Sequence, residues 1–445
     1  MRGAIRALTT ALGFICLGLG GAAAAGDPGL IFIHAGTLLA VPGEAPLSRQ
    51  TVIVENGRIT NVIAGFVAPK QARVIDLSDS FVLPGLMDLH VHLTLEPKPG
   101  AHLRAATQSA ADLALIAARN ARRTLQAGFT TVVDLGRPGT PAHETAIFAL
   151  RDAIEAGTVP GPRILAAGSP ISATGQSRRP RYRDEVEAVI GPVAVCNGAD
   201  DCRRAVREQV KKGADIISFY DTGSLLFPQP VTQAMTDDEM RAIVVAAHAL
   251  GRKVIADGHH AKGVAAAIRA GVDAVDSVHF PDRQTFALIK RSGVYLQSHI
   301  YAVVAAVGDS LETVDQGLVN WYPRPVLERL FRIKMKPFTM TEAYKAGVRK
   351  LAFASDSGNF PHGDNAQDFV EFVKRGMTEM DAIRTSTVNA ADLLGLSGDH
   401  GRLQAGNVAD LIAVAASPLD DISELTRVRF VMRAGHVYKA WRDGP

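Results

Sequence analysis

Both ends of the chain share one pattern of hydrophobic and polar positions. From residue 30 to about 80, short apolar or alternating runs are separated by glycine, asparagine and aspartate, which is typical of strands joined by turns. Asn56-Gly57 predicts a tight hairpin turn in this region. The same pattern returns in the stretches 401–418 and 428–441. We therefore predict a small β-sandwich domain built from both chain ends, residues 26–82 and 401–445.

The middle of the chain has a different pattern, in which short apolar runs alternate mostly with helix-like segments that often end in glycine. The strand-like runs lie at residues 82–92, 129–136, 163–168, 214–220, 253–259, 274–280, 294–299 and 351–358. This order predicts the α/β class and a (β/α)8 TIM barrel over residues 83–400. A doubly wound open sheet is the alternative, but no glycine-rich phosphate loop follows the first run.

The amino terminus has the layout of a secretory signal peptide. Arg2 and Arg6 precede an apolar stretch, and the small residues Ala22 to Ala25 follow it. We predict that residues 1–25 are removed and that the protein is periplasmic or secreted. A membrane anchor is the alternative, but the apolar stretch is short for a spanning helix. No later segment is apolar and long enough to span a bilayer, so we expect no stable membrane span after cleavage.

Composition and cysteine content narrow the partners. The 445 residues are 47% hydrophobic and 21% charged, as in ordinary globular proteins, and the net charge is only +3. Without a long basic run, we expect no nucleic-acid partner. Export would place Cys196 and Cys202 in an oxidising compartment, which favours a disulfide over two unpaired thiols. A homo-oligomer is compatible with the sequence.

Polar residues gather where the predicted barrel strands end, which is where TIM-barrel active sites lie. His90 and His92 are two residues apart, so a strand would point both rings to one face. Two neutral core histidines are the alternative interpretation. The other candidates at strand ends are Asp257, His259, Ser277, His279, His299 and Asp356. Imidazole and carboxylate together suit zinc, iron or manganese.

Several segments resemble the metal-dependent amidohydrolase superfamily, and the resemblance extends over nearly the whole mature chain. The segments are PGLMDLHVHL at residue 84, GPRILAAG at 161, FASDSGNFPHGDN at 353 and GRLQAGNVADLIAV at 401. The imidazolonepropionase-like and Xaa-Pro-dipeptidase-like branch is the most similar. The first and third segments, together with the C-terminal block, are specific, whereas a lone His-x-His would not be.

The resemblance implies a function and a set of roles. His90 and His92 would hold a divalent metal, expected to be zinc, and Asp356 would bind the metal and act as general base. The activated water would cleave an amide C–N bond of a small-molecule substrate. A dipeptide, an N-acyl amino acid or a cyclic amide would fit.

The sequence departs from the family pattern at three positions. Ser218 stands where binuclear members have a metal-bridging lysine, and Asp257 and Ser277 stand where histidines are expected. His259 and His279 follow two residues later, on the same face of a strand but about 6.6 Å further along it.

We therefore predict one ion rather than two. Its ligands would be His90, His92, Asp356 and either Asp257 or His259. The predicted catalytic residues are Asp356, His259 and His279. The alternative is a metal-poor, inactive amidohydrolase-fold binding protein. His362 is expected to shape its loop. The four arginines in residues 176–183 either attract a substrate carboxylate or form a solvated charged run.

Overall fold

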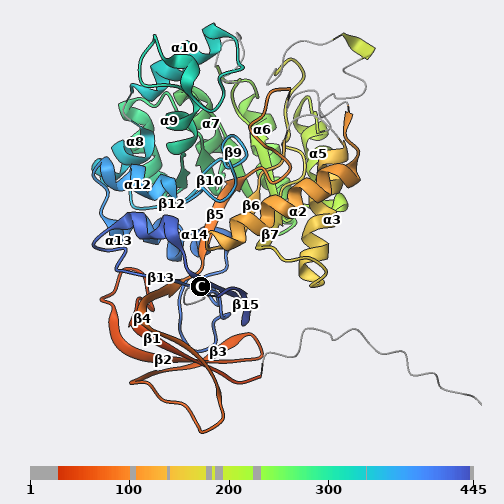
Figure 1. Cartoon of the computed structure of the whole chain (residues 1–445). Coiled ribbons are helices and arrows are strands. Elements are labelled where there is room, and N and C mark those ends of the chain that lie inside the picture. The colour runs from red at the N-terminus through yellow and green to blue at the C-terminus, as the bar shows by residue number, and fades with distance from the viewer. Residues whose placement is uncertain are drawn as a thin grey trace, which may run out of the picture.

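The computed structural model describes residues 29–100, 107–137, 141–176, 183–185, 194–223, 232–336 and 338–440. The predicted signal peptide lies outside this part of the chain, as does the arginine-rich segment except for Gln176 and Arg183. Figure 1 shows a sheet built from both chain ends beside a larger body of strands and helices. In the described residues, no helix combines the length and the apolar character that crossing a membrane requires.

The sheet made by the chain ends has seven strands in the order β15-β14-β13-β4-β1-β2-β3. Its strands are β1 (Ile31–Leu38), β2 (Leu47–Glu55), β3 (Arg58–Ala64), β4 (Arg73–Pro84), β13 (Leu411–Val414), β14 (Phe430–Arg433) and β15 (His436–Lys439). Strand β4 joins the two chain ends, because it pairs in parallel with β1 and antiparallel with β13. Buried side chains of both ends, among them Ile33, Val52 and Leu411, share one apolar cluster.

The predicted sandwich differs from this arrangement in one respect. A sandwich has two sheets packed face to face, whereas these strands form one continuous hydrogen-bonded sheet. The physical reason is the pairing of β4 on both of its edges, for example Ile33 with Ile75 and Leu83 with Ile412.

The larger body is of the α/β class and contains two parallel sheets. The first has the order β5-β6-β7 and the second β12-β11-β10-β9-β8. The strands are β5 (Leu86–Val91), β6 (Phe129–Asp134), β7 (Arg163–Ala166), β8 (Ile216–Tyr220), β9 (Lys253–Asp257), β10 (Ala274–Asp276), β11 (Tyr295–Gln297) and β12 (Leu351–Ala352). Each lies within one of the eight predicted runs, but several end earlier than predicted.

Isolated parallel bridges connect the two sheets. Val91 pairs with Ser357 beyond β12, and Ile171 beyond β7 pairs with Phe219 of β8. Every residue of β5, β6 and β8 is buried, as expected for strands covered on both faces.

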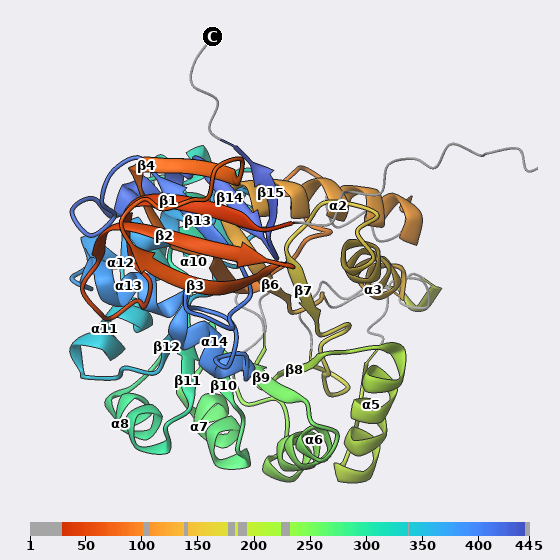
Figure 2. The ribbon, with the colours of Figure 1, turned by 90° about the horizontal axis from the view of Figure 1, so that it is seen from below.

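Helices cover the strands of this body on the outside. Figure 2 shows α5, α6, α7 and α8 in an arc outside β8 to β11. The described α-helices are α2 (Ala110–Gln126), α3 (Pro141–Glu155), α5 (Ala199–Lys212), α6 (Asp237–Ala249), α7 (Ala261–Ala270), α8 (Arg283–Ser292), α9 (Tyr301–Ala306), α10 (Arg324–Lys334), α11 (Thr339–Lys345), α12 (Gln367–Lys374), α13 (Glu379–Thr385) and α14 (Val388–Leu394). Two short 3-10 helices are η2 (Val314–Gln316) and η3 (Ile422–Arg427).

Helix α2 illustrates why these segments are helical. Ser109 and Asp112 form a reciprocal capping box at its start, which satisfies backbone N–H groups that have no partner within the helix. Leu113, Ala117 and Leu125 are buried at helical spacing and face the core. Helix α2 is one of the helix-like segments that the sequence predicts between the strand-like runs.

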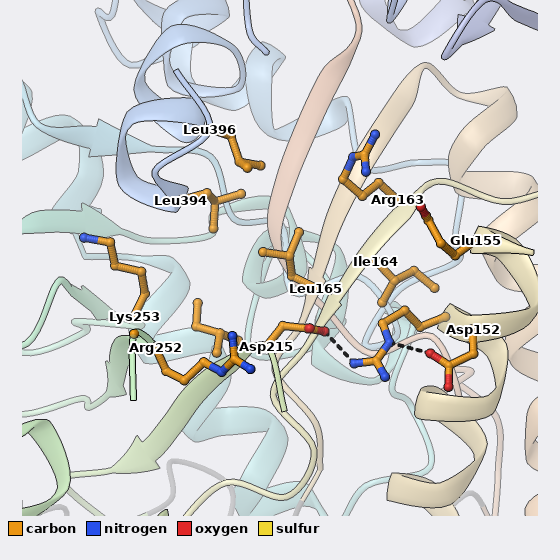
Figure 3. A pocket seen from close by; sticks show the side chains of 13 residues that line it. Asp152, Glu155, Arg163, Ile164, Leu165, Asp215, Arg252, Lys253, Leu394 and Leu396 are labelled. Carbon is orange, nitrogen blue, oxygen red and sulfur yellow. Dashed lines mark hydrogen bonds and ion pairs between the residues drawn. The ribbon is translucent and has the colours of Figure 1, made fainter. Parts of the chain in front are cut away.

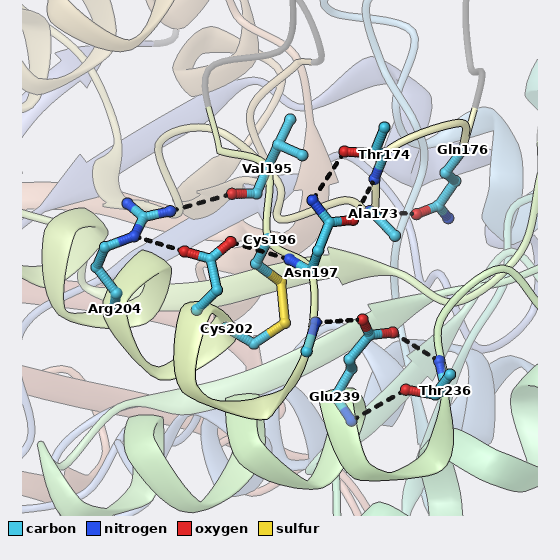
Figure 4. Close-up of a disulfide and its surroundings, with 12 residues drawn as sticks. Ala173, Thr174, Gln176, Val195, Cys196, Asn197, Cys202, Arg204, Thr236 and Glu239 are labelled. Atoms are coloured by element: carbon cyan, nitrogen blue, oxygen red, sulfur yellow. Dashed lines mark hydrogen bonds and ion pairs between the residues drawn. A yellow bond between two sulfur atoms is a disulfide. The ribbon is translucent and has the colours of Figure 1, made fainter.

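Cys196 and Cys202 form a disulfide at the start of α5, as the sequence favoured. The bond fixes a segment that runs beside the loop after β7, where the Cys196 N–H donates to the Ser172 carbonyl at 2.9 Å. The Gly198 N–H donates to Glu239 Oε1 of α6 at 2.7 Å (Figure 4). The disulfide therefore anchors this segment where it lies between the loop after β7 and helix α6.

Replacing both cysteines by serine is expected to lower the free energy of unfolding by about 2 kcal/mol, because closing even a short loop restricts the unfolded chain. Urea denaturation of the double variant Cys196→Ser/Cys202→Ser measures this, with reduced wild-type protein as the control. Equal transition midpoints for oxidised wild type and variant would contradict the expectation.

Candidate metal centre

Backbone hydrogen bonds bring the end of β5 against the chain that follows β12. The Asp356 N–H donates to the His90 carbonyl at 2.9 Å, and the His92 N–H donates to the Ser357 carbonyl at 2.8 Å. Asp356 has φ of +61°, a left-handed conformation that is uncommon for residues other than glycine. This bend lies four residues beyond the end of β12 at Ala352 and places the Asp356 carboxylate beside both imidazoles.

Three donor atoms converge there. His90 Nε2 and His92 Nε2 are 3.2 Å apart. Asp356 Oδ1 lies 3.1 Å from His92 Nε2 and 3.5 Å from His90 Nε2. Ligand atoms bound at 2.0–2.1 Å to a tetrahedral zinc ion are about 3.3–3.4 Å from one another. The residues present therefore fit a divalent cation, and they are the three whose grouping the sequence predicted.

A carboxylate supports His90 from behind. His90 Nδ1 lies 2.5 Å from Asp276 Oδ2, and both side chains are buried. Such a contact fixes the orientation of a metal-binding imidazole and makes it a better ligand. Burial lowers the pKa of His90, but the carboxylates of Asp276, Asp356 and Asp257 outweigh burial and raise the pKa to about 10. The same negative field would favour a bound cation.

Asp356 is ionised in this environment. Burial raises its pKa, but His90, His299 and His92 together hold the pKa well below the usual range. His299 Nε2 lies 3.6 Å from Asp356 Oδ2, whereas the other oxygen, Oδ1, is the one paired with His90 and His92. His90, Asp276 and His299 form a second group whose candidate ligand atoms all lie within 4.8 Å of one another.

The structure leaves Asp257 and His259 outside both groups of converging ligand atoms. Strand β9 ends at Asp257 and β10 ends at Asp276, so His259 and His279 lie beyond the strands. Ser277 has φ of +61°, which breaks the strand period that the predicted two-residue shift required. The roles predicted for Asp257, His259 and His279 therefore stay predictions, without strand alternation to support them.

His259 and His279 instead contact each other. Their Nδ1 atoms are 3.2 Å apart, and His259 Nδ1 lies 3.0 Å from the Ser277 carbonyl. The ring of His279 is 5.3 Å from that of His299, which in turn faces Asp356. Burial and the neighbouring His259 and His299 hold the pKa of His279 well below its usual range, so this ring is neutral.

Two supporting residues did not emerge from the sequence. Asp276 precedes Ser277, which stands where the family has a histidine, but no pattern in the sequence singles out Asp276 itself. Asp88 is buried and accepts hydrogen bonds from the Ser355 N–H at 3.0 Å and from Asn365 Nδ2 at 2.7 Å. A carboxylate two residues before His90, on the same strand, is the only sequence signal for that role.

His362 has the role that its segment suggested. Its Nδ1 lies 2.8 Å from Ser357 Oγ, and its Nε2 lies 3.2 Å from the Leu95 carbonyl. These contacts tie the loop after β12 to the segment after β5. His362 belongs to neither ligand group of the described residues.

Comparison with known proteins agrees with this geometry. The sequence profile of the Amidohydrolase family matches residues 81–444. The chain belongs to this family. Its members are hydrolases of carbon–nitrogen bonds that generally use divalent metals, which is the coarse function that the sequence resemblance implied.

Several relatives align over almost the full length of this amidohydrolase. The ochratoxinase of Aspergillus niger is 28% identical, and the alignment covers 93% of this chain and 87% of the relative. A Xaa-Pro dipeptidase with bound methionine in its active site is 33% identical with a TM-score of 0.80, over 92% of this chain and 100% of that one. A prolidase complexed with N-methylphosphonate-L-proline is 26% identical with a TM-score of 0.79, over 92% and 100%.

The variant His92→Ala is expected to lose bound metal, because it removes one of three converging donors. Elemental analysis of protein purified without chelator should fall from about one equivalent to roughly a tenth of that or less. His436→Ala, which changes an exposed histidine of β15, is the matched control. Equal metal content in the two variants would exclude His92 as a ligand.

The variant Asp276→Asn is expected to weaken metal binding by about 10–100-fold, because His90 loses the carboxylate behind it. A competition titration against a metallochromic chelator measures the dissociation constant. Asp420→Asn, at an exposed position, serves as the control. Unchanged affinity in Asp276→Asn would show that the contact does not support the ligand.

Proposed function

We propose that this protein is an exported, zinc-dependent amidohydrolase that cleaves an amide bond to an amino acid, as in a dipeptide or an N-acyl amino acid. A cyclic amide fits the same chemistry. The observation that carries the proposal is the convergence of His90 Nε2, His92 Nε2 and Asp356 Oδ1 within 3.1–3.5 Å at strand ends. One ion fits these three donors, in line with the absence of the bridging lysine at Ser218.

The residues around the site have distinct tasks in this proposal. A divalent cation held there supplies Lewis acidity, which polarises a carbonyl group and acidifies a water molecule. Asp356 is the general base: its carboxylate accepts the proton of the attacking water and passes it to the leaving nitrogen. His299, 3.6 Å from Asp356 Oδ2, holds that oxygen in position. The Nδ1 atom of the neutral His279 ring contacts the Ser277 carbonyl and therefore carries the proton, so Nε2 would accept a hydrogen bond from substrate.

The substrate class rests on the relatives. The Xaa-Pro dipeptidase named above contains bound methionine, and the prolidase is complexed with N-methylphosphonate-L-proline. Both align with over nine-tenths of this chain. The ochratoxinase also aligns with over nine-tenths of this chain. We infer that this amidohydrolase acts on a comparably small amide, and the particular acyl and amine groups are to be found by screening.

The finer architecture belongs to the same proposal. We infer that β5 to β12 close into a (β/α)8 barrel over residues 83–400, with its active site where the strands end. The bridges between Val91 and Ser357 and between Ile171 and Phe219, one on each side of the three-stranded sheet, support closure. The disulfide between Cys196 and Cys202 supports export, because such bonds persist in oxidising compartments.

The variant Asp356→Asn is expected to lower the turnover number by roughly 1,000-fold or more, because it removes a ligand and the general base together. Hydrolysis is measured on a panel of Xaa-Pro dipeptides and N-acyl amino acids, with metal content determined on the same samples. Asp420→Asn is the control and should match wild type.

Wild-type protein that carries metal and hydrolyses a member of the panel supports the proposal. The opposite outcome is wild-type protein that neither contains nor takes up zinc, iron or manganese and that binds amides without turnover. That outcome would favour the alternative function, an inactive binding protein. Full activity in metal-free protein would remove the assigned roles of His90 and His92.

A further inference from the structure

A second pocket lies at the other end of the strands from the candidate metal centre. It has a volume of about 480 Å³, within the range of small-molecule sites. Its lining includes Arg163 at the start of β7, Asp215 and Ile216 at the start of β8, and Lys253 at the start of β9. His92 and Asp356 follow the opposite ends of their strands. We call this cavity the basal pocket (Figure 3).

The acidic residues of the basal pocket are already paired. Arg151 Nη1 donates to Asp215 Oδ2 at 2.7 Å, and Arg151 Nε donates to Asp152 Oδ1 at 2.9 Å. Glu155 lies 3.6 Å from the guanidinium of Arg433. Asp152 and Asp215 share Arg151, so the lining as a whole, with Arg151, Arg163, Arg252 and Lys253 against Asp152, Glu155 and Asp215, carries one more positive than negative charge.

Two arginines of the lining remain without a counter-ion. Within the described residues, Arg163 and Arg252 make no ion pair, and the Nε atom of each is buried without a hydrogen-bond partner. Both residues are partly exposed, so only the Nε atom of each guanidinium is buried without an acceptor, and buried donors of this kind are normally satisfied. The two side chains give the basal pocket an excess of positive charge that an anionic ligand would compensate.

The two arginines lie apart, with apolar residues between them. Strand β8 runs between β7 and β9, so the chain at Arg163 and at Arg252 is separated sideways by two strand spacings, about 9–10 Å. Ala166 is level with Asp215, so Arg163 also lies three residues, about 10 Å, further toward the start of its strand, and the two long side chains must bridge part of this distance. Figure 3 shows the two side chains on opposite sides of the view, with Leu165 between them. Leu394 and Leu396, at the end of α14, complete the apolar part of the lining.

We propose that the basal pocket binds a linear organic dianion, with one anionic group on Arg163, the other on Arg252 and an apolar spacer against the leucines. A planar guanidinium matches a carboxylate through paired hydrogen bonds, so a dicarboxylate is the fitting chemistry. This site is separate from the proposed hydrolytic site and does not depend on the activity assigned there.

Isothermal titration of the metal-loaded protein with suberate, a linear aliphatic dicarboxylate, tests the proposal. We expect saturable binding that either Arg163→Gln or Arg252→Gln weakens about tenfold or more, because each removes a charge-assisted contact. Hexanoate, with one carboxylate, should bind at least about tenfold more weakly than suberate. Arg324→Gln, which changes an exposed arginine of α10, is the control and should bind suberate as wild type does.

Three results would overturn the proposal: no saturable binding of suberate, equal binding of hexanoate, or binding that both arginine substitutions leave unchanged. Should a glutamine variant fail to fold, a crystal structure of wild-type protein with suberate decides the matter. Density for the ligand between Arg163 and Arg252 supports the site, and density only elsewhere refutes it.

Discussion

The hydrogen-bonded contact between the end of β5 and residues 353–357 is the constraint on which the candidate metal centre depends. Besides the bonds made by Asp356 and His92, the Leu89 N–H donates to the Phe353 carbonyl at 2.9 Å. The buried carboxylate of Asp88 accepts from the backbone of both segments, at His90 and Ser355. Burial raises the pKa of Asp88 to about 6, although these hydrogen bonds act to lower it. All three converging donors are thus fixed by one contact between segments far apart in sequence.

The charge around this contact is unusual for a protein interior. Asp134 and Asp276 are buried and Asp356 is half-buried near His90 and His92, and burying carboxylates is unfavourable unless they are paired. Burial raises the pKa of Asp134, although His92 and the Leu93 and Gly136 N–H groups oppose it. Two histidines can compensate at most two of the three negative charges of these carboxylates. A cation therefore suits this interior for reasons that go beyond the geometry of its ligands.

Much of this arrangement could be predicted from the sequence, because it follows from local patterns. The eight strands lie within the predicted runs, and the spacing of His90 and His92 placed both rings together. The predictions for His259 and His279 assumed that the strand period continues, and it stops at Asp257 and Asp276. The part played by Asp276 depends on the distance between two strands that are not neighbours, which no local pattern reveals.

The double pairing of β4 has a consequence for how the molecule is assembled. Strand β4 leads into β5 through Gly85, whose N–H donates to the Asp410 carbonyl and whose missing side chain leaves room for Thr130. The partner of β4 on that edge, β13, is synthesised 327 residues later, counted from Pro84 to Leu411. This edge of β4 is therefore covered late, and a chain released early by the ribosome would present it, open, to other chains.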